Sequence, residues 1–230
     1  MPRVAGGGET VAVIASVKGL HALPIPEPAP QRDRVQSPEI QPPRDRLETI
    51  ERAVRDILAA VGEDVNREGL KDTPARVARM CFEIFSGLHD DPGRFLASVF
   101  QEEAHDGTVI VRDIPFHSVC EHHLLPFFGR ASVAILPRDG RLPGLSSIAS
   151  VVQTLARRPQ MQERLNDQIV ETICDRLGPR GAFAVLEAEH LCVTMRGARV
   201  TGSTTLTTAA RGVFQDDPAA RAEVLALLRP

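Results

Sequence analysis

The sequence contains no tryptophan and no tyrosine, and only four of its 230 residues are cysteine. The scarcity of aromatic side chains disfavours a surface that binds nucleic acid by base stacking. A formal net charge of −3 provides no bulk attraction to nucleic acid or to an anionic membrane. Four scattered cysteines do not form a dense disulfide framework, and they fit a reduced chain better. We therefore expect a cytoplasmic protein that binds neither nucleic acid nor a membrane.

Residues 1–44 differ in composition from the rest of the chain. They contain three consecutive glycines and the repeated prolines Pro24, Pro26, Pro28, Pro30, Pro38, Pro42 and Pro43. Because repeated proline blocks helix and sheet, we predict a disordered tail here, with a docking arm as the alternative. The apolar run at 11–17 is too short to span a bilayer.

The remaining chain alternates between helical and strand-like patterns, and its length fits one ordinary domain with an appendage. Helices are predicted at 46–61, 73–87, 146–156, 161–177 and 219–228. Strands are predicted at 108–116, 130–136, 182–195 and 203–210. This divides the chain into an N-terminal helical region at 45–100 and a catalytic domain at 101–230. Cys81 and Cys174 fall on apolar stripes of predicted helices, so we interpret both as core residues.

Cys120 and His123 have the ordinary spacing of two metal ligands. The only other close pair of histidine and cysteine is His190 and Cys192. If both stretches are strands that meet in space, Cys120, His123 and Cys192 could hold a metal with one position open, as in catalytic zinc sites. Residues two apart in a strand share a face, so His190 and Cys192 would point the same way. His122 and His190 would then be acid or base groups beside the metal.

Four motifs, in order, resemble the GTP cyclohydrolase I family. They are GLKDTPARVA at 69–78, DIPFHSVCEHHLLPF at 113–127, RPQMQERL at 158–165 and HLCVTMRG at 190–197. The resemblance runs from about Leu47 to the C-terminus. It implies an α+β tunnelling fold, in which an antiparallel sheet carries two helices on one face, preceded by N-terminal helices. Such units form ring-shaped homo-oligomers with active sites between subunits, and similar bacterial enzymes are decamers.

The resemblance also implies a zinc-dependent hydrolase that opens the guanine imidazole ring of GTP. The products are formate and 7,8-dihydroneopterin triphosphate, on the route to pterins and tetrahydrofolate. Zinc held by Cys120, His123 and Cys192 can make water a usable nucleophile near neutral pH. His122 and His190 match the family's proton-transfer groups, and imidazole titrates near working pH.

The matching positions for the substrate are Glu163, Gln162, Ser146, Arg76 and Arg196. A carboxylate such as Glu163 can accept hydrogen bonds from the N1–H and 2-amino groups of guanine. Taken alone, a glutamate on a helix is more often a solvated charge, and only the motif assigns Glu163 to guanine. Gln162 beside it is the weaker candidate. Ser146, Arg76 and Arg196 belong to the phosphate end.

The phosphate end departs from the family pattern. The family usually reads Gly-Leu-Ser-Lys, with an arginine three residues after the lysine, whereas Ser147 and Ser150 stand at those positions here. Many relatives also carry lysine where Val200 stands. Each lost charge-assisted contact is worth about 1.5–3 kcal/mol.

Two explanations of these losses stay open. Arg138, Arg141 or a residue from a neighbouring subunit could supply the charge. Alternatively, the substrate could be a less phosphorylated or modified guanine nucleotide. A catalytically weakened relative with a binding or regulatory role is a further reading. The retained Cys and His set favours an enzyme, because a binding protein has little reason to keep metal ligands and proton-transfer groups together.

Overall fold

The computed structural model describes residues 42–100 and 105–228. The tail predicted at 1–44 therefore lies outside the described residues, except for 42–44. None of the helices in these described ranges is long and apolar enough to cross a membrane.

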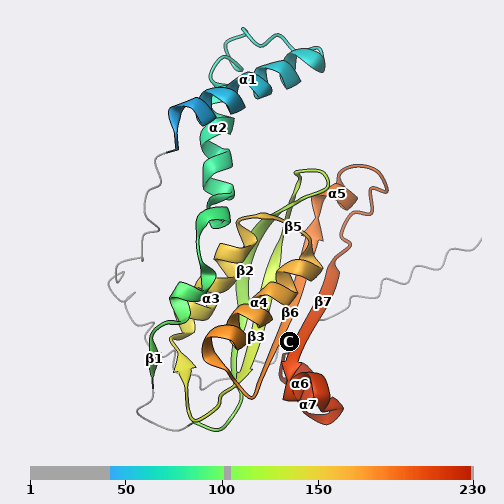
Figure 1. Ribbon diagram of the computed structural model, residues 1–230. Coiled ribbons are helices and arrows are strands. Elements are labelled where there is room, and N and C mark those ends of the chain that lie inside the picture. The colour runs from blue at the N-terminus through green and yellow to red at the C-terminus, as the bar shows by residue number, and fades with distance from the viewer. Residues whose placement is uncertain (1–41, 101–104, 229–230) are drawn as a thin grey trace, which may run out of the picture. The chain divides into compact units, whose positions relative to one another are not determined.

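Five strands form the central sheet in the order β5-β2-β3-β6-β7 (Figure 1). They are β2 (Val109–Cys120), β3 (Pro126–Leu136), β5 (Pro159–Gln160), β6 (Gly181–His190) and β7 (Thr205–Gly212). Neighbouring strands run antiparallel, except that the short β5 runs parallel to the end of β2. That pairing sets Gln160 opposite Cys120, so the start of the next helix lies beside the first expected metal ligand.

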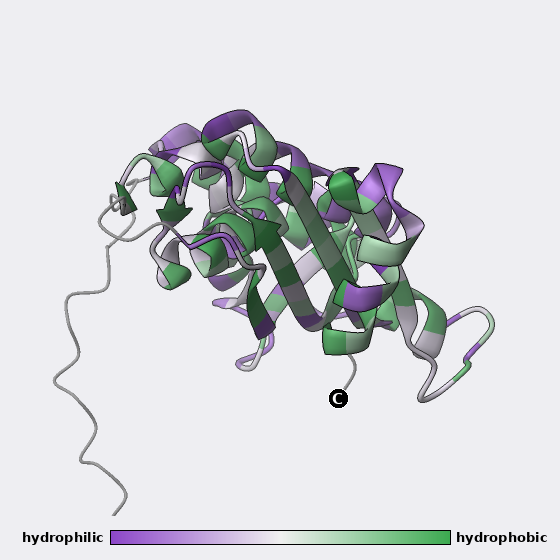
Figure 2. Cartoon of the chain, turned by 90° about the horizontal axis from the view of Figure 1, so that it is seen from below, coloured by the Kyte–Doolittle hydropathy of each residue, from purple (hydrophilic) through white to green (hydrophobic). Residues whose placement is uncertain are grey.

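Two helices pack on the sheet, α3 (Leu145–Ala156) and α4 (Gln162–Leu177) (Figure 1). In α4 the fully buried residues Leu165, Ile169 and Ile173 recur every four positions, which is the spacing of one helical face. Gly178, in the left-handed conformation at φ 58°, ends this helix. The expected α+β class is confirmed, as is the order of two strands, two helices and two strands. Figure 2 shows hydrophobic residues concentrated along the central strands.

The opposite face of the sheet is partly covered by α6 (Val213–Asp216) and α7 (Pro218–Leu228). Phe214 and Val224 from these helices form a second cluster with Ala134 and Phe183. Successive side chains of a strand point to opposite faces, and the neighbours of Ala134 and Phe183 lie in the cluster under α3 and α4. The sheet therefore has apolar residues on both faces at this end.

The N-terminal part of the described chain is helical, as predicted. It contains α1 (Arg44–Ala60), α2 (Thr73–Ile84) and two 3-10 helices, η1 (Ser86–His89) and η2 (Pro92–Leu96). It ends in β1 (Val99–Phe100), which pairs with β4 (Leu142–Pro143). No residue of α1 is buried, although the sequence gives the helix an apolar stripe.

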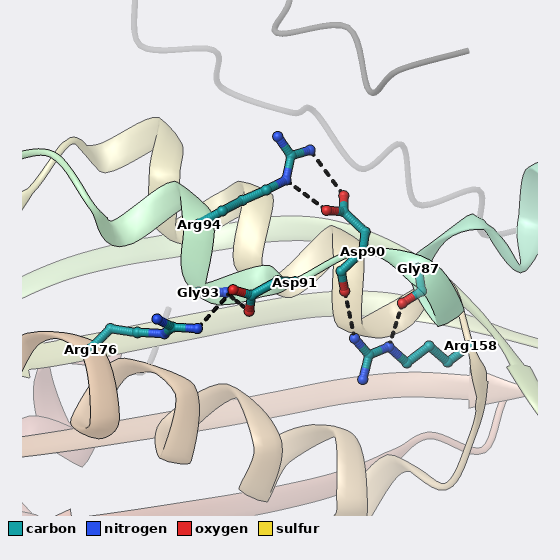
Figure 3. A network of polar contacts seen from close by, with 7 residues as sticks. All are labelled: Gly87, Asp90, Asp91, Gly93, Arg94, Arg158 and Arg176. Atoms are coloured by element: carbon teal, nitrogen blue, oxygen red, sulfur yellow. Dashed lines mark hydrogen bonds and ion pairs between the residues drawn. The ribbon is translucent and has the colours of Figure 1, made fainter. Parts of the chain in front are cut away.

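A polar network fastens η1 and η2 to the ends of α3 and α4 (Figure 3). The guanidinium of Arg158 donates to the carbonyl oxygens of Gly87, at 2.7 Å, and Asp90, at 3.0 Å. At the other end of α4, Arg176 pairs with the Asp91 carboxylate at 2.7 Å. These contacts join segments that are more than sixty residues apart in the sequence.

The end of one strand and the burial of two cysteines differ from the sequence predictions. The predicted strand at 182–195 is wrong in its second part, because β6 ends at His190 and Leu191–Thr194 form the short helix α5. Cys81 and Cys174 are half-buried rather than buried. The thiol of Cys174 packs against the main core, whereas that of Cys81 does not belong to it.

Candidate active site

Cys120, His123 and Cys192 bring two thiols and one imidazole together, with all ligand atoms within 4.8 Å of one another. Cys120 is the buried last residue of β2, and His123 lies in the turn that leads to β3. The distance from Cys120 Sγ to His123 Nδ1 is 3.9 Å. Zinc binds thiolate and imidazole, and three protein ligands leave one position for water or substrate. The donor set therefore fits a catalytic zinc ion.

Cys192 reaches this group from α5 rather than from a strand. His190, the last residue of β6, is paired with Phe127 of β3. A longer β6 would next meet Pro126, which has no N–H to donate to a ladder. The chain turns there, so His190 and Cys192 do not share a strand face, contrary to the sequence prediction.

The turn at 121–125 is short and tightly closed. The Cys120 N–H donates to the Leu125 carbonyl at 2.9 Å, and the Leu124 N–H donates to the Cys120 carbonyl at 2.8 Å. Leu124 adopts a left-handed φ of 53°, which is uncommon for this residue type. The predicted strand at 108–116 is too short, because β2 continues to Cys120 and only the histidines lie in the turn.

The environment of Cys192 connects the metal group with Arg196. Burial, followed by its contact with Cys120, raises the pKa of the Cys192 thiol, and the Arg196 guanidinium opposes this rise. Two adjacent thiolates repel each other, and a bound divalent cation removes that repulsion. Arg196 is itself exposed, so its charge faces solvent near the ligand group.

His190 is held by two contacts. Its Nε2 lies 2.7 Å from Oε1 of Gln162, and its ring stacks on Phe127 with centroids 4.6 Å apart and planes 2° apart. Burial lowers the pKa of His190, while the nearby Glu163 carboxylate opposes that shift. Glu163 is exposed in the first turn of α4. The structure therefore places Glu163, Gln162 and His190 together.

The carboxamide of Gln162 is used within the protein. The side chain is 1% exposed. Its Nε2 donates to the carbonyl oxygens of Leu186 and Thr205, both at 3.0 Å, and lies 3.1 Å from the Thr207 hydroxyl. Three oxygen partners fix the amino group on that side, which leaves Oε1 facing His190. Sequence reasoning placed Gln162 at the guanine base and missed this contact with the histidine.

His122 directly precedes the metal ligand His123 and is exposed. Its Nδ1 is 3.8 Å from Cys120 Sγ, and its ring is inclined by 72° to that of His123. The two adjacent imidazoles therefore diverge, and His122 stays close to the ligand group without belonging to it.

Sequence reasoning did not single out Glu121 and Arg164. Both carboxylate oxygens of Glu121 accept hydrogen bonds from the Arg164 guanidinium, one of them at 3.0 Å. The hydrogen bond from Arg164 is the main cause that lowers the pKa of the Glu121 carboxyl. The sequence did contain a hint of their role. Glu121 directly follows the metal ligand Cys120, and Arg164 directly follows Glu163, each inside one of the family motifs.

The structure does not bring Ser146 to the metal group within one chain. The C-terminal end of α3 lies on the side of the metal-ligand group, because the hydroxyl of Ser118, two residues before Cys120, donates to the Ala156 carbonyl at 2.7 Å. Ser146 is at the other end of this 12-residue helix, which is about 18 Å long at 1.5 Å per residue. The Ser150 hydroxyl is used within the same helix, where it donates to the Ser146 carbonyl at 3.1 Å.

Arg76 is likewise not placed beside the metal ligands. It lies on α2 and pairs with Asp72 at 3.2 Å, with both side chains largely exposed. Among the residues expected at the phosphate end, Arg196 is the one whose charge acts on a metal ligand, because it opposes the rise in the pKa of the Cys192 thiol.

Comparisons with known proteins agree over most of the chain. The family model described as GTP cyclohydrolase I matches residues 50–229. The chain is 55% identical over 187 residues to "GTP cyclohydrolase 1" of Geobacillus sp. (strain WCH70), covering 81% of this chain and 99% of the relative. It is 57% identical over 178 residues to the Bacillus subtilis (strain 168) protein of the same name, covering 77% and 93%. With the Carboxydothermus hydrogenoformans protein, also "GTP cyclohydrolase 1", identity is 56% over 181 residues, covering 79% and 94%.

Proposed function

The chain belongs to the GTP cyclohydrolase I family, and we propose that it hydrolyses the imidazole ring of GTP, releasing formate and forming 7,8-dihydroneopterin triphosphate. One observation carries this proposal. Cys120, His123 and Cys192 form a metal-ligand group at the end of the sheet where His190 and Glu163 also meet. This reaction needs ligands for a metal ion, a group that transfers protons, and a carboxylate that accepts hydrogen bonds from guanine.

The metal proposed for this site is zinc, held by Cys120, His123 and Cys192. The two thiols and one imidazole support zinc over harder cations, which prefer oxygen ligands. When bound, zinc supplies Lewis acidity that makes water a usable nucleophile near neutral pH.

We assign proton transfer to His190 and His122. The hydrogen bond of His190 Nε2 to Gln162 leaves Nδ1 as the ring nitrogen available for exchange with the purine. Stacking on Phe127 restricts the ring orientation. His122 is exposed, lies 3.8 Å from Cys120 Sγ and is the second candidate.

Guanine recognition is assigned to Glu163. Its carboxylate can accept hydrogen bonds from the N1–H and 2-amino groups and would be repelled by an acceptor at those positions. The support is its exposed place in the first turn of α4, beside His190.

The phosphate end is assigned to Arg196 in the same chain and to Ser146 and Arg76 from neighbouring copies. The separation of Ser146 from the metal group by the length of α3 supports sites that are shared between subunits. The proposed assembly is a ring-shaped homo-oligomer, a decamer as the resemblance implies. Four free cysteines support a reduced, cytoplasmic setting.

A less phosphorylated or modified guanine nucleotide remains the second candidate substrate, because Ser147 and Ser150 replace two basic residues. The deciding experiment incubates zinc-loaded protein with GTP, GDP, GMP and guanosine, and follows formate and pterin fluorescence. The proposal predicts both products from GTP. Zinc-loaded protein that releases no formate from any of the four would refute it, and preferential turnover of GMP or guanosine would favour the second candidate.

A further inference from the structure

Glu121 lies between a metal ligand and a proposed proton-transfer residue. Its carboxylate accepts two hydrogen bonds from the guanidinium of Arg164, one from Nη2 to Oε1 at 3.0 Å and one from Nη1 to Oε2. Glu121 Oε1 also lies 3.9 Å from Nε2 of His122. Arg164 directly follows Glu163 in the first turn of α4. The pair therefore links the turn after β2 to the helix that carries the proposed guanine acceptor.

Only the beginning of that turn is held by backbone contacts to the α4 side. Gln160 is the register partner of Cys120, and its carbonyl accepts the Glu121 N–H at 3.0 Å. The next contacts of the turn are internal, since the N–H groups of His123 and Leu124 both donate to the Cys120 carbonyl. The Glu121–Arg164 pair is therefore the side-chain link that orients the remainder of the turn against α4.

This pair differs from most other ion pairs of the described residues. Arg67–Glu63 and Arg94–Asp90 are examples of pairs four residues apart, which stabilise their own local segment. Glu121 and Arg164 are 43 residues apart and interact through both carboxylate oxygens. An exposed ion pair contributes little to stability, whereas a bidentate arginine–carboxylate pair fixes relative orientation.

We infer that Glu121 and Arg164 form a positioning pair, which fixes the turn carrying His122 and His123 relative to Glu163. This inference rests on the proposed function, because the pair matters if Glu163 holds guanine while the metal end acts on it. Neither residue needs to touch the substrate. Loosening the pair would keep all the metal ligands and Glu163 in the protein but would shift them relative to one another. Small misalignments of reacting groups reduce turnover strongly.

The test uses Arg164→Met, Arg164→Lys, Glu121→Gln and the double variant Glu121→Gln with Arg164→Met, in the full chain. Arg176→Met is the matched control, because Arg176 lies on the same helix and pairs with Asp91 at 2.7 Å at its far end. Zinc content, thermal midpoint, the dissociation constant of the metal-free protein for GTP, and kcat and KM are measured for each.

We expect Arg164→Met and Glu121→Gln each to lower kcat by roughly tenfold or more. The double variant should lose little beyond the larger single effect, since both changes remove the same link. Arg164→Lys should have a kcat between those of Arg164→Met and the wild type, because lysine keeps the charge but cannot bind the carboxylate through two parallel hydrogen bonds. Zinc content, thermal midpoint and GTP binding should stay near wild type, and Arg176→Met should keep wild-type kcat.

Unchanged kcat in Arg164→Met would overturn the inference while leaving the proposed function intact. So would zinc loss in proportion to the loss of kcat, because the pair would then serve metal binding. Equal losses in Arg176→Met would also overturn it, since any ion pair of α4 would have the same effect. Zinc-loaded wild-type protein without activity on GTP would instead refute the proposed function, and this inference with it.

Discussion

Nε2 of His190 lies 2.7 Å from Oε1 of Gln162. The amino group of Gln162 is occupied by oxygens of Leu186, Thr205 and Thr207, so the carboxamide has one orientation. The histidine nitrogen facing Oε1 must then carry a hydrogen. This contact gives the buried residue Gln162 a positioning role toward His190.

The first prediction concerns Gln162→Ala. We expect a lower kcat with little change in KM, because the orientation of His190 is lost while Glu163 remains. The free energy of unfolding should fall by about 1–3 kcal/mol, since the buried Leu186 carbonyl loses its donor. Steady-state kinetics and urea unfolding measure both effects, with the exposed Gln153→Ala as control. A raised KM at unchanged kcat would show that Gln162 contacts the substrate instead.

The second prediction concerns metal binding. Metal analysis should find about one zinc per chain in the wild type, as expected for a single group of three ligands. Cys192→Ala should lose most of it, and Cys81→Ala should keep it because Cys81 lies outside the ligand group. Undiminished zinc in Cys192→Ala would remove this cysteine from the site.

The third prediction tests sites shared between subunits. Cys192→Ala removes a ligand, and Ser146→Asp places a negative charge at the proposed phosphate end, so each variant alone should be inactive. Mixed oligomers from equal amounts should regain roughly a quarter of wild-type activity, because such sites combine two intact halves. Mass measurement must show that the subunits have mixed. Mixed oligomers without activity, or a monomeric wild type in light scattering, would contradict shared sites.

The fourth prediction concerns the missing charges at the phosphate end. Ser147→Lys with Ser150→Arg should raise kcat/KM for GTP, by up to roughly tenfold for each recovered contact worth about 1.4 kcal/mol. Activity on guanosine, which has no phosphate, should not rise and serves as the control. No gain with GTP, combined with a strong wild-type preference for GTP over GMP, would mean that other residues already supply the charge.

The fifth prediction concerns the attachment of η1. A Cβ at Gly87 would lie 2.0 Å from the Thr154 carbonyl oxygen and 2.9 Å from that of Arg157. Gly87→Ala should therefore lower the free energy of unfolding by about 1–3 kcal/mol or more. Denaturant unfolding measures the change, with the neighbouring Ser86→Ala for comparison. Equal stability of the two variants would show that this segment yields without cost.

Local periodicity was sufficient to predict most of the helices and strands, whereas their arrangement as a tunnelling fold was implied by the family resemblance. The apolar positions of α4 recur at helical spacing, and α3 and α4 are separated at residues 159 and 160, between the two predicted helices. The end of β6 could not be predicted in the same way. It depends on Pro126 of the neighbouring strand, and the register of two strands is not visible in either sequence segment.

The ligand group itself was predictable, because cysteine and histidine were close together at only two places. The contacts around it were not. The Glu121–Arg164 pair joins residues 43 positions apart. Nothing in the sequence distinguishes either residue from an ordinary charged residue exposed to solvent. The use of Gln162 within the protein depends on carbonyl oxygens of β6 and on Thr205 and Thr207, which no spacing rule connects to it.

The most direct test of the account is a zinc titration of metal-free protein in the presence of GTP, with the rate of formate release as the readout. The account predicts that the rate rises in proportion to added zinc and levels off at about one zinc per chain, while Cys192→Ala stays inactive throughout. Full formate release without zinc, or wild-type release by Cys192→Ala, would contradict it.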